Sequence, residues 1–149
     1  MIVRNLDQIV GTDRDVEGPS FRSRRFLLAG DGTDFSFHDT VLHAGTETSM
    51  WYRHHVEAVY CVEGTGQLEN LETGDVHAVG PGTFYCLDGH ERHRLRADTA
   101  MRMMCVFTPP LTGNEVHDED GTYPLVLDPP GLDTEPETDR TSRPSEANG

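Results

Sequence analysis

The sequence predicts an all-β protein whose short strands form one antiparallel barrel or jelly roll. About eight short runs of alternating or apolar residues follow residue 34, and glycine-rich turns separate them. Helical periodicity is scarce, because only Asn5–Ile9 in the N-terminal segment predicts a short helical turn. With 149 residues the chain can bury one core but is too short for two domains. Together these features indicate a single small β domain.

Each expected strand ends at a turn signal. Ala44-Gly45 closes the first run, Gly64-Thr65-Gly66 and Gly80-Pro81-Gly82 close later ones, and Pro109-Pro110 follows the last. The expected strands are, in chain order, Phe35–Leu42, Met50–Tyr52, Val56–Val62, Gln67–Leu71, Val76–Val79, Thr83–Leu87, Arg92–Ala97 and Met101–Phe107.

The alternation within these strands also predicts which side chains face the interior. In Arg92–Ala97 the arginines take every second position, so we expect them in solvent and His93 inside. The same reasoning places Glu57 on one face with Val59, and Tyr85 on one face with Leu87. Cys105 and Phe107 are expected to face inward as well. A barrel interior that holds polar groups must supply them with partners.

The composition changes near the C-terminus and predicts a domain boundary there. Residues 128–149 contain four prolines, six acidic residues and almost nothing apolar. Such a segment cannot bury enough surface to offset the entropy of ordering it. We therefore expect a folded domain over residues 1–127 and a disordered acidic tail over residues 128–149.

A chain that stops after Leu127 is expected to fold and to keep whatever activity the full-length protein has. Its formal charge changes from −14 to −10, so the loss should be confined to some solubility. Circular dichroism, solubility and turnover of the two proteins check this expectation. An inactive truncation would show that the tail takes part in the site.

The charge balance excludes two classes of partner. All 12 basic residues are arginine, against 26 acidic residues. Neither a phosphate backbone nor an anionic membrane surface suits such a chain, so no nucleic-acid or membrane partner is expected. The acidic surface fits either a protein that works in high salt or an ordinary acidic protein.

The sequence contains no signal for export or membrane insertion. No apolar run approaches the length of a membrane span, and the N-terminal residues lack the apolar stretch of a signal peptide. Cys61, Cys86 and Cys105 are odd in number, lie in apolar stretches and have no CxxC spacing. We expect three reduced core thiols in a cytoplasmic protein.

Two glycine-bounded frames carry the candidate chemistry. Gly45, Trp51, Arg53, Glu57 and Gly64 keep the spacing of a motif in which cupins have Gly, His, His, Glu and Gly. Both histidine positions are therefore replaced. The usual cupin metal site of three histidines and one glutamate is absent.

The second frame retains one ligand. Gly82, Asp88, His90 and His93 keep the spacing of the second cupin motif, with Asp88 and His90 at its Pro and Gly positions. Glu57, His93 and the nearby Tyr85 remain as candidate ligands. Two oxygens and one nitrogen suit a divalent ion such as iron(II) better than zinc, which prefers Cys and His.

A purely structural interpretation competes with metal binding. In that interpretation Glu57 pairs with a buried arginine and Tyr85 hydrogen-bonds a carbonyl group. The adjacent pair His54-His55 is a poor ligand pair, because neighbouring strand residues point to opposite faces, although one of them can still face the cavity.

Longer local matches occur in one order along the chain and identify a family. They are MIVRNL at the N-terminus, then 23–25, 35–40, 44–48, 57–61, 108–113 and 115–125. Through these stretches the sequence resembles the ectoine synthases over nearly all of residues 1–127. The tail has no part in the resemblance.

The resemblance implies a cupin barrel, an antiparallel homodimer and one iron(II) per subunit. It implies ring closure of N4-acetyl-L-2,4-diaminobutyrate to L-ectoine with loss of water, a hydro-lyase reaction in compatible-solute synthesis. The family's iron ligands fall on Glu57, Tyr85 and His93, and candidates for proton transfer on Tyr85, Glu115 and His117. Substrate contacts fall on Phe21, Arg25, Thr40, Tyr52, His55, Phe107 and Glu115. Phe21 stands where the family usually has Trp, so an indole N–H donor is lost there.

Without the resemblance, each of these residues has an ordinary structural explanation. Arg25 fits a surface arginine, Phe107 a core phenylalanine, and Glu115 and His117 a polar loop. Two other functions also remain open, a non-catalytic cupin that binds a small solute and a cupin dioxygenase or isomerase with altered ligands.

Overall fold

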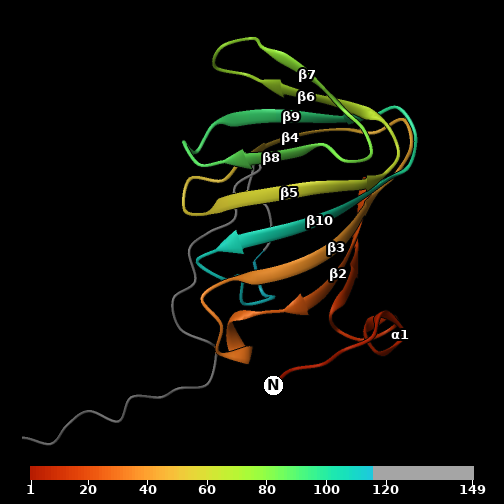
Figure 1. Cartoon of the computed structure of the whole chain (residues 1–149), viewed down its shortest axis with the longest axis vertical. Helices are drawn as coiled ribbons and strands as arrows, with labels where there is room; N and C mark the ends of the chain where they lie inside the picture. Colours follow the sequence, from red (N-terminus) through yellow and green to blue (C-terminus); the bar gives the residue numbers. More distant parts are fainter. Residues whose placement is uncertain (116–149) are drawn as a thin grey trace, which may run out of the picture.

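The computed structural model describes residues 1–115, and they form two antiparallel sheets that share one core (Figure 1). The larger sheet has the order β1-β2-β3-β10-β5-β8 and the smaller β4-β9-β6-β7. The strands of the larger sheet are β1 Asp15–Glu17, β2 Phe21–Leu27, β3 Ser36–Leu42, β5 Val56–Glu63, β8 Phe84–Leu87 and β10 Met101–Thr108. Those of the smaller sheet are β4 Glu47–Trp51, β6 Gly66–Asn70, β7 Val76–Val79 and β9 Arg92–Ala97.

The expected all-β fold is confirmed, and the short helix lies where the sequence predicted it. Helix α1 spans Leu6–Ile9, and Asn5 caps it by accepting a hydrogen bond from the amide of Asp7. Residues 128–149 and the domain boundary before them lie outside the described residues. None of the helices in residues 1–115 is long and apolar enough to cross a membrane.

The sequence did not predict the first two strands, β1 and β2. Strand β2 carries three arginines in four positions, which hides its alternation. In the structure Arg22 pairs with Asp15 of β1 at 2.7 Å and Arg24 pairs with Asp39 of β3 at 2.7 Å. These partners come from other strands, so the charges of Arg22 and Arg24 are balanced only once the sheet has formed.

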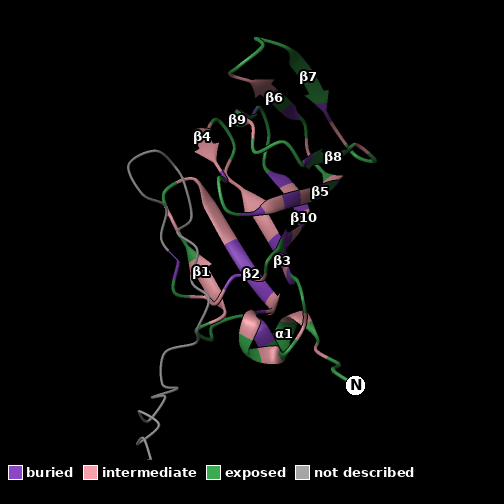
Figure 2. Cartoon of the chain, turned by 90° about the vertical axis from the view of Figure 1, so that its left-hand side faces the viewer, coloured by how far each residue is buried: buried purple, intermediate pink, exposed green. Residues whose placement is uncertain are grey.

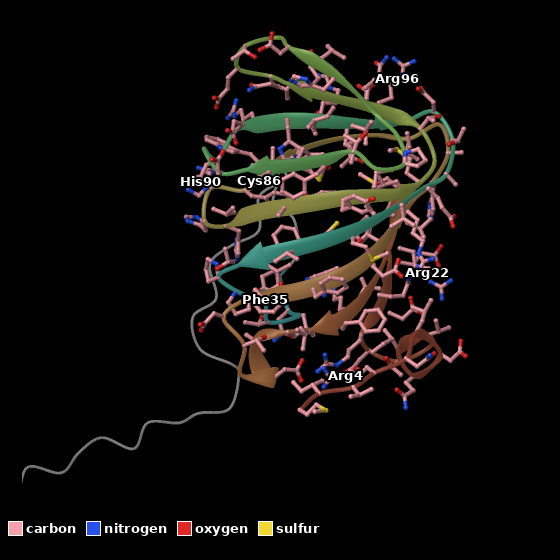
Figure 3. All side chains as sticks on the ribbon, in the orientation of Figure 1. Arg4, Arg22, Phe35, Cys86, His90 and Arg96 are labelled. Carbon is pink, nitrogen blue, oxygen red and sulfur yellow. The ribbon has the colours of Figure 1, made fainter. Side chains whose placement is uncertain are left out.

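The predicted orientations hold in β5, β9 and β10. His93, Leu95 and Ala97 are buried, whereas the arginines between them are exposed or half-buried (Figure 2). Glu57 is buried on the same face as Val59. The expectation of three core thiols was wrong for one cysteine. Cys86 is exposed on β8 (Figure 3), because it alternates with Tyr85 and Leu87 and so lies on the outer face.

Two backbone positions show what the glycine positions of the two frames require of the chain. Gly64 has φ +87°, and a Cβ there would collide with the carbonyl oxygen of Ala100. His90 occupies the glycine position of the second frame and adopts φ 55°, the left-handed region that is unfavourable for a side chain.

A buried carboxylate on the outer face of the larger sheet, that of Asp39, links strands β2, β3 and β10. Asp39 is almost fully buried and accepts hydrogen bonds from Arg24 at 2.7 Å and from Arg102 at 2.7 Å. Burial alone would raise the pKa of Asp39, but the hydrogen bonds and charges of Arg102 and Arg24 outweigh it and lower the pKa. The carboxylate is therefore ionised in the folded protein at neutral pH.

The variant Asp39→Asn is expected to lower the free energy of unfolding by about 3 kcal/mol at pH 7, because it leaves two guanidinium groups without their counter-charge. A depressed folded pKa stabilises the protein above the unfolded pKa, and this contribution is lost as the pH falls through the folded value. The difference from wild type should therefore shrink below about pH 4. Urea unfolding from pH 7 to pH 3 measures it, with exposed Asp34→Asn as the control. If the difference in unfolding free energy between Asp39→Asn and wild type did not change with pH, Asp39 would not be the ionised partner of the two arginines.

Candidate active site

The three predicted metal ligands come from three strands and face the interior between the two sheets. Val59 pairs with Tyr85 and Glu57 with Leu87, so Glu57 and Tyr85 are diagonal neighbours on the inner face of the larger sheet. His93 is buried on the inner face of the smaller sheet, where its cross-strand partners are Met50 and Asn70.

The hydrogen bonds of His93 fix its tautomer. Its Nδ1 lies 3.1 Å from the backbone oxygen of Glu91, and since a carbonyl only accepts, Nδ1 carries the proton. Nε2 is then an unprotonated nitrogen. It is fully buried and has no hydrogen-bond partner among the described residues. Burial also lowers the pKa of His93, which keeps the imidazole neutral. A buried, unpartnered lone pair oriented by a backbone carbonyl is typical of a metal-ligating histidine.

Glu57 and Tyr85 are held in their neutral forms when the protein contains no cation. Burial raises the pKa of Glu57 to about 8, and a hydrogen bond from Tyr52 opposes this rise. Burial raises the pKa of Tyr85 well above its usual range, and the nearby Glu57 carboxylate adds to the shift. No ion pair joins Glu57 to an arginine within residues 1–115, as the structural interpretation would require. A divalent cation between these groups would favour their anionic forms.

The donor set is unusual for a metal centre because it needs a phenol. Within residues 1–115, no group of three or more His, Cys, Asp and Glu side chains could hold a metal ion. Glu57 and His93 would supply two donors, and the phenol oxygen of Tyr85, a cross-strand neighbour of Glu57, would be the third. An iron ion accepts oxygen and nitrogen donors of this kind. The residues therefore fit iron(II), through the vacant Nε2 of His93 and the two inward oxygens.

A narrow cavity of about 70 Å³ adjoins these residues. Six of the residues predicted for the site line it, namely Phe21, Thr40, Tyr52, Glu57, Tyr85 and Phe107. Phe107 stacks edge-on against Tyr52, with ring centroids 5.1 Å apart, and against His38 at 5.4 Å. These aromatic contacts give part of the cavity apolar walls.

Arg25 is buried rather than exposed at the surface. Its guanidinium donates to the backbone oxygen of Gly113 at 3.3 Å, whereas its Nε has no hydrogen-bond partner among the described residues. No acidic side chain of residues 1–115 forms an ion pair with it. A buried cation without a counter-charge is costly, and an anionic ligand would remove that cost.

Glu115 holds the loop against which Arg25 lies. Its carboxylate accepts hydrogen bonds from the amides of Thr112 at 2.7 Å and Gly113 at 2.9 Å. The predicted proton-transfer residue is thus engaged by backbone N–H groups, and its direct contribution here is to position the carbonyl group of Gly113. His117 lies outside the described residues.

His55 is buried beside Phe107, with ring centroids 6.2 Å apart, and its Nδ1 lacks a partner among the described residues. Burial lowers its pKa, while the nearby Glu115 carboxylate opposes that change. His54, its neighbour, is exposed, so one histidine of the pair faces the interior as expected, although both lie in the loop between β4 and β5 and not in a strand.

Sequence reasoning missed a buried polar relay at the edge of the cavity. His38 lies between Ser23, at 3.2 Å from its Nδ1, and Ser36, at 3.1 Å from its Nε2. Burial and the nearby Arg25 lower the pKa of His38 to about 3, so the ring is neutral. The alternation that places Thr40 inward also places His38 inward, and this signal was present in the sequence. Ser23 had no such signal, because β2 itself was not predicted.

His90 connects the turn between β8 and β9 to the loop that carries two site residues (Figure 3). Its Nδ1 lies 2.9 Å from the backbone oxygen of Tyr52 and 3.2 Å from that of His55. Its own backbone oxygen accepts from the indole N–H of Trp51 at 2.9 Å. These bonds offset the cost of its left-handed backbone, which is about 1–2 kcal/mol for a residue with a Cβ.

The variant His90→Ala is expected to be less stable than His90→Gly by about 1 kcal/mol, because both lose the imidazole but only alanine keeps the backbone strain. Both should raise KM, since the Tyr52–His55 loop loses its tether. Urea unfolding and steady-state kinetics of the two variants separate the effects. Equal stability of the alanine and glycine variants would contradict the strain argument.

The fold and the inward triad define a small cupin-type barrel. The cupin domain of an XRE-family transcriptional regulator from Enterobacter cloacae shares this fold at 13% identity, with a TM-score of 0.52 over 61% of this chain and 98% of that one. The ectoine synthase family model matches residues 1–127. The chain belongs to the ectoine synthase family, as its sequence resemblance predicted.

Individual relatives agree with this assignment. The L-ectoine synthase of Thermobifida fusca is 59% identical over 128 residues, which cover 86% of this chain and 96% of the relative. That of Nocardia farcinica is 58% identical over 129 residues, covering 87% and 98%. The crystal structure of ectoine synthase from P. lautus has a TM-score of 0.78 and 52% identity, covering 95% of this chain and all of that one.

Proposed function

We propose that the chain closes the ring of N4-acetyl-L-2,4-diaminobutyrate at an iron(II) centre held by Glu57, Tyr85 and His93. Membership of the ectoine synthase family supports the reaction. The vacant, buried Nε2 of His93 is the observation that carries the metal proposal. When bound, the metal ion would act as a Lewis acid that polarises the unreactive amide carbonyl of the substrate.

The chain's own residues hold the substrate for an intramolecular attack. Arg25 binds the α-carboxylate with its planar guanidinium, which lacks a counter-charge among the described residues. Thr40 and the aromatic walls around Phe107 orient the remainder. Holding the α-amine over the amide carbonyl carbon contributes a large share of the rate, because both groups belong to one molecule.

Two protons must move during the reaction, and Tyr85 is placed to take part. The attacking amine loses its proton, and the departing oxygen leaves as water after gaining protons. The Tyr85 hydroxyl borders the cavity beside Glu57. The aromatic walls limit the access of bulk water, which favours loss of water over hydrolysis of the ring.

The direct test is to incubate iron-loaded protein with N4-acetyl-L-2,4-diaminobutyrate and to follow the product by mass spectrometry. We expect a product lighter than the substrate by one water. Metal-free protein and His93→Ala should form it at a small fraction of that rate. Binding without conversion would favour the solute-binding cupin, and an oxidised product would favour the dioxygenase.

We further propose that the protein is a homodimer in the cytoplasm, where it takes part in osmotic protection. The family resemblance supports the dimer, and three free cysteines support a reducing compartment. Sedimentation analysis at several concentrations tests the dimer.

A further inference from the structure

The two positions at which the cupin motif has histidines hold Trp51 and Arg53 in this chain, and neither side chain faces the interior. Met50 and Tyr52 line the cavity, so Trp51 between them lies on the outer face of the smaller sheet, where it is half-buried. Arg53 is exposed, and Arg92 of β9 is the cross-strand partner of Trp51. Any effect of these side chains on the cavity is therefore exerted through the residues beside them.

Two guanidinium groups lie against the indole ring of Trp51. The guanidinium carbon of Arg53 is 4.2 Å from the ring centroid, and that of Arg92 is 4.0 Å from it. The indole ring attracts cations more strongly than the other aromatic side chains do. Because Arg92 belongs to β9, which lies beside β4 (Figure 1), the contact joins the end of one strand to the start of the other. We call Trp51, Arg53 and Arg92 the tryptophan clamp.

A pair of reciprocal hydrogen bonds connects the clamp to the loop of residues 52–55. The indole N–H of Trp51 donates to the backbone oxygen of His90 at 2.9 Å. In return, Nδ1 of His90 bonds the backbone oxygens of Tyr52 at 2.9 Å and His55 at 3.2 Å. The loop is thus held at its first and its last residue.

Tyr52 is the residue through which this restraint reaches the site. It is buried and forms a side-chain hydrogen bond with Glu57. Its ring packs against those of Phe107, with centroids 5.1 Å apart, and His93, at 5.6 Å. Trp51 precedes Tyr52 directly and points to the opposite face, so one stretch of backbone carries both side chains. Fixing the outer ring therefore fixes the origin of the inner one.

We infer that the tryptophan clamp positions Tyr52 for the reaction from outside the barrel. This inference rests on the proposed active site, in which Tyr52 contacts two of the metal ligands and the wall of the cavity. A shift of about 1 Å at reacting groups can lower a rate about a hundredfold, even when the altered residue lies far from the chemistry. Outer partners of metal ligands change metal affinity or activity by about tenfold or more. Trp51, Arg53 and Arg92 are thus positioning residues rather than surface decoration.

The first experiment removes both cations and keeps the indole. In Arg53→Gln/Arg92→Gln we expect kcat/KM for N4-acetyl-L-2,4-diaminobutyrate to fall about tenfold, with a higher KM and a lower kcat, and iron(II) to bind several-fold more weakly. The matched control is Arg94→Gln/Arg96→Gln. It removes two charges from the outer face of the same sheet, where both arginines pair with acidic side chains, and should change the kinetics little.

Hydrogen–deuterium exchange separates positioning from a general loss of structure. In Arg53→Gln/Arg92→Gln the amides of residues 52–56 should exchange several-fold faster than in wild type, whereas those of β10 should be unchanged. Trp51 is the single tryptophan of the chain, which gives a second measurement. Its fluorescence anisotropy should gain a nanosecond decay once the two guanidinium groups are removed.

Substitution of Trp51 itself tests the chemical nature of the contact. Trp51→Phe and Trp51→Leu both lose the indole N–H, but only phenylalanine keeps a ring face for the guanidinium groups. We expect kcat/KM of Trp51→Phe to exceed that of Trp51→Leu by about threefold or more. Equal activity of the two variants would exclude the cation–ring contact as the source of the effect.

The outcomes separate this inference from the proposed function. Lower kcat/KM together with faster exchange confined to residues 52–56 supports the clamp. Kinetics and exchange in Arg53→Gln/Arg92→Gln equal to those of the arginine control would overturn it while leaving the proposed function intact. A uniform rise of exchange along the chain would overturn it as well, because the clamp would then contribute only to stability. A wild-type protein that does not convert the substrate would overturn the proposed function itself.

Discussion

Replacing His93 with alanine is expected to remove both iron and turnover while leaving the barrel folded. The variant deletes the unpartnered Nε2 of His93, and the proposed centre with three protein donors would lose one of them. We expect the iron content to fall by about tenfold or more and kcat by about a hundredfold or more. Glu57→Ala and Tyr85→Ala should behave in the same way.

Elemental analysis and kinetics of each variant make the measurement, and circular dichroism confirms the fold. His43→Ala is a suitable control, because His43 is half-buried and its ring contacts Glu17 and the backbone of Pro19 and lines neither pocket beside the triad. If all three triad variants kept the full iron content, the metal would lie elsewhere. Loss of iron in only the His93 variant would argue against Tyr85 and Glu57 as ligands.

Changes at Arg25 should lower activity and, in one variant, raise stability. Arg25→Lys keeps the charge but loses the planar fork, so we expect a higher KM, a lower kcat and a loss in kcat/KM of about tenfold to a hundredfold. Arg25→Met removes the buried cation that lacks an acidic partner among the described residues. Its free energy of unfolding without substrate should therefore be equal to or above that of wild type.

A residue that binds substrate should lose activity when it is replaced without losing folding stability, whereas a structural residue should lose both. Arg22→Lys is the control, because Arg22 pairs with Asp15 at the surface and should tolerate the change. Thermal unfolding with and without substrate, together with steady-state kinetics, measures both quantities. Unchanged kinetics in Arg25→Lys would return Arg25 to a structural role, as would a large loss of stability in Arg25→Met.

Most of the correct predictions of strands and inward-facing residues came from the alternation of side chains along the sequence. It was enough for most strands after residue 34, although β4 spans Glu47–Trp51 and not the expected Met50–Tyr52. It also predicted that Glu57, Tyr85 and His93 face the interior before any partner was known. It failed for β2, because Arg24 can be buried only beside Asp39, which is 15 residues away in the chain. Local pattern alone does not contain such a pairing.

The finer features of the site depended on contacts that no local pattern contains. The tautomer of His93 follows from a backbone carbonyl, and the neutrality of His38 follows from burial beside Arg25. Glu115 was predicted as a proton-transfer group, yet in the structure its carboxylate accepts backbone amides of its own loop. Tautomers, protonation states and hydrogen-bond partners of this kind are set by tertiary contacts, which local sequence patterns do not contain.

The unpaired edge of β7 has a consequence for local unfolding. This strand is hydrogen-bonded only to β6 within the described residues, and three of its four residues are exposed. Its backbone amides should exchange with deuterium earlier than those of β10, which has a neighbour on both sides. The outermost hairpin can thus detach transiently while the larger sheet stays intact, and each such event would leave the buried imidazole of His93 briefly in contact with bulk water.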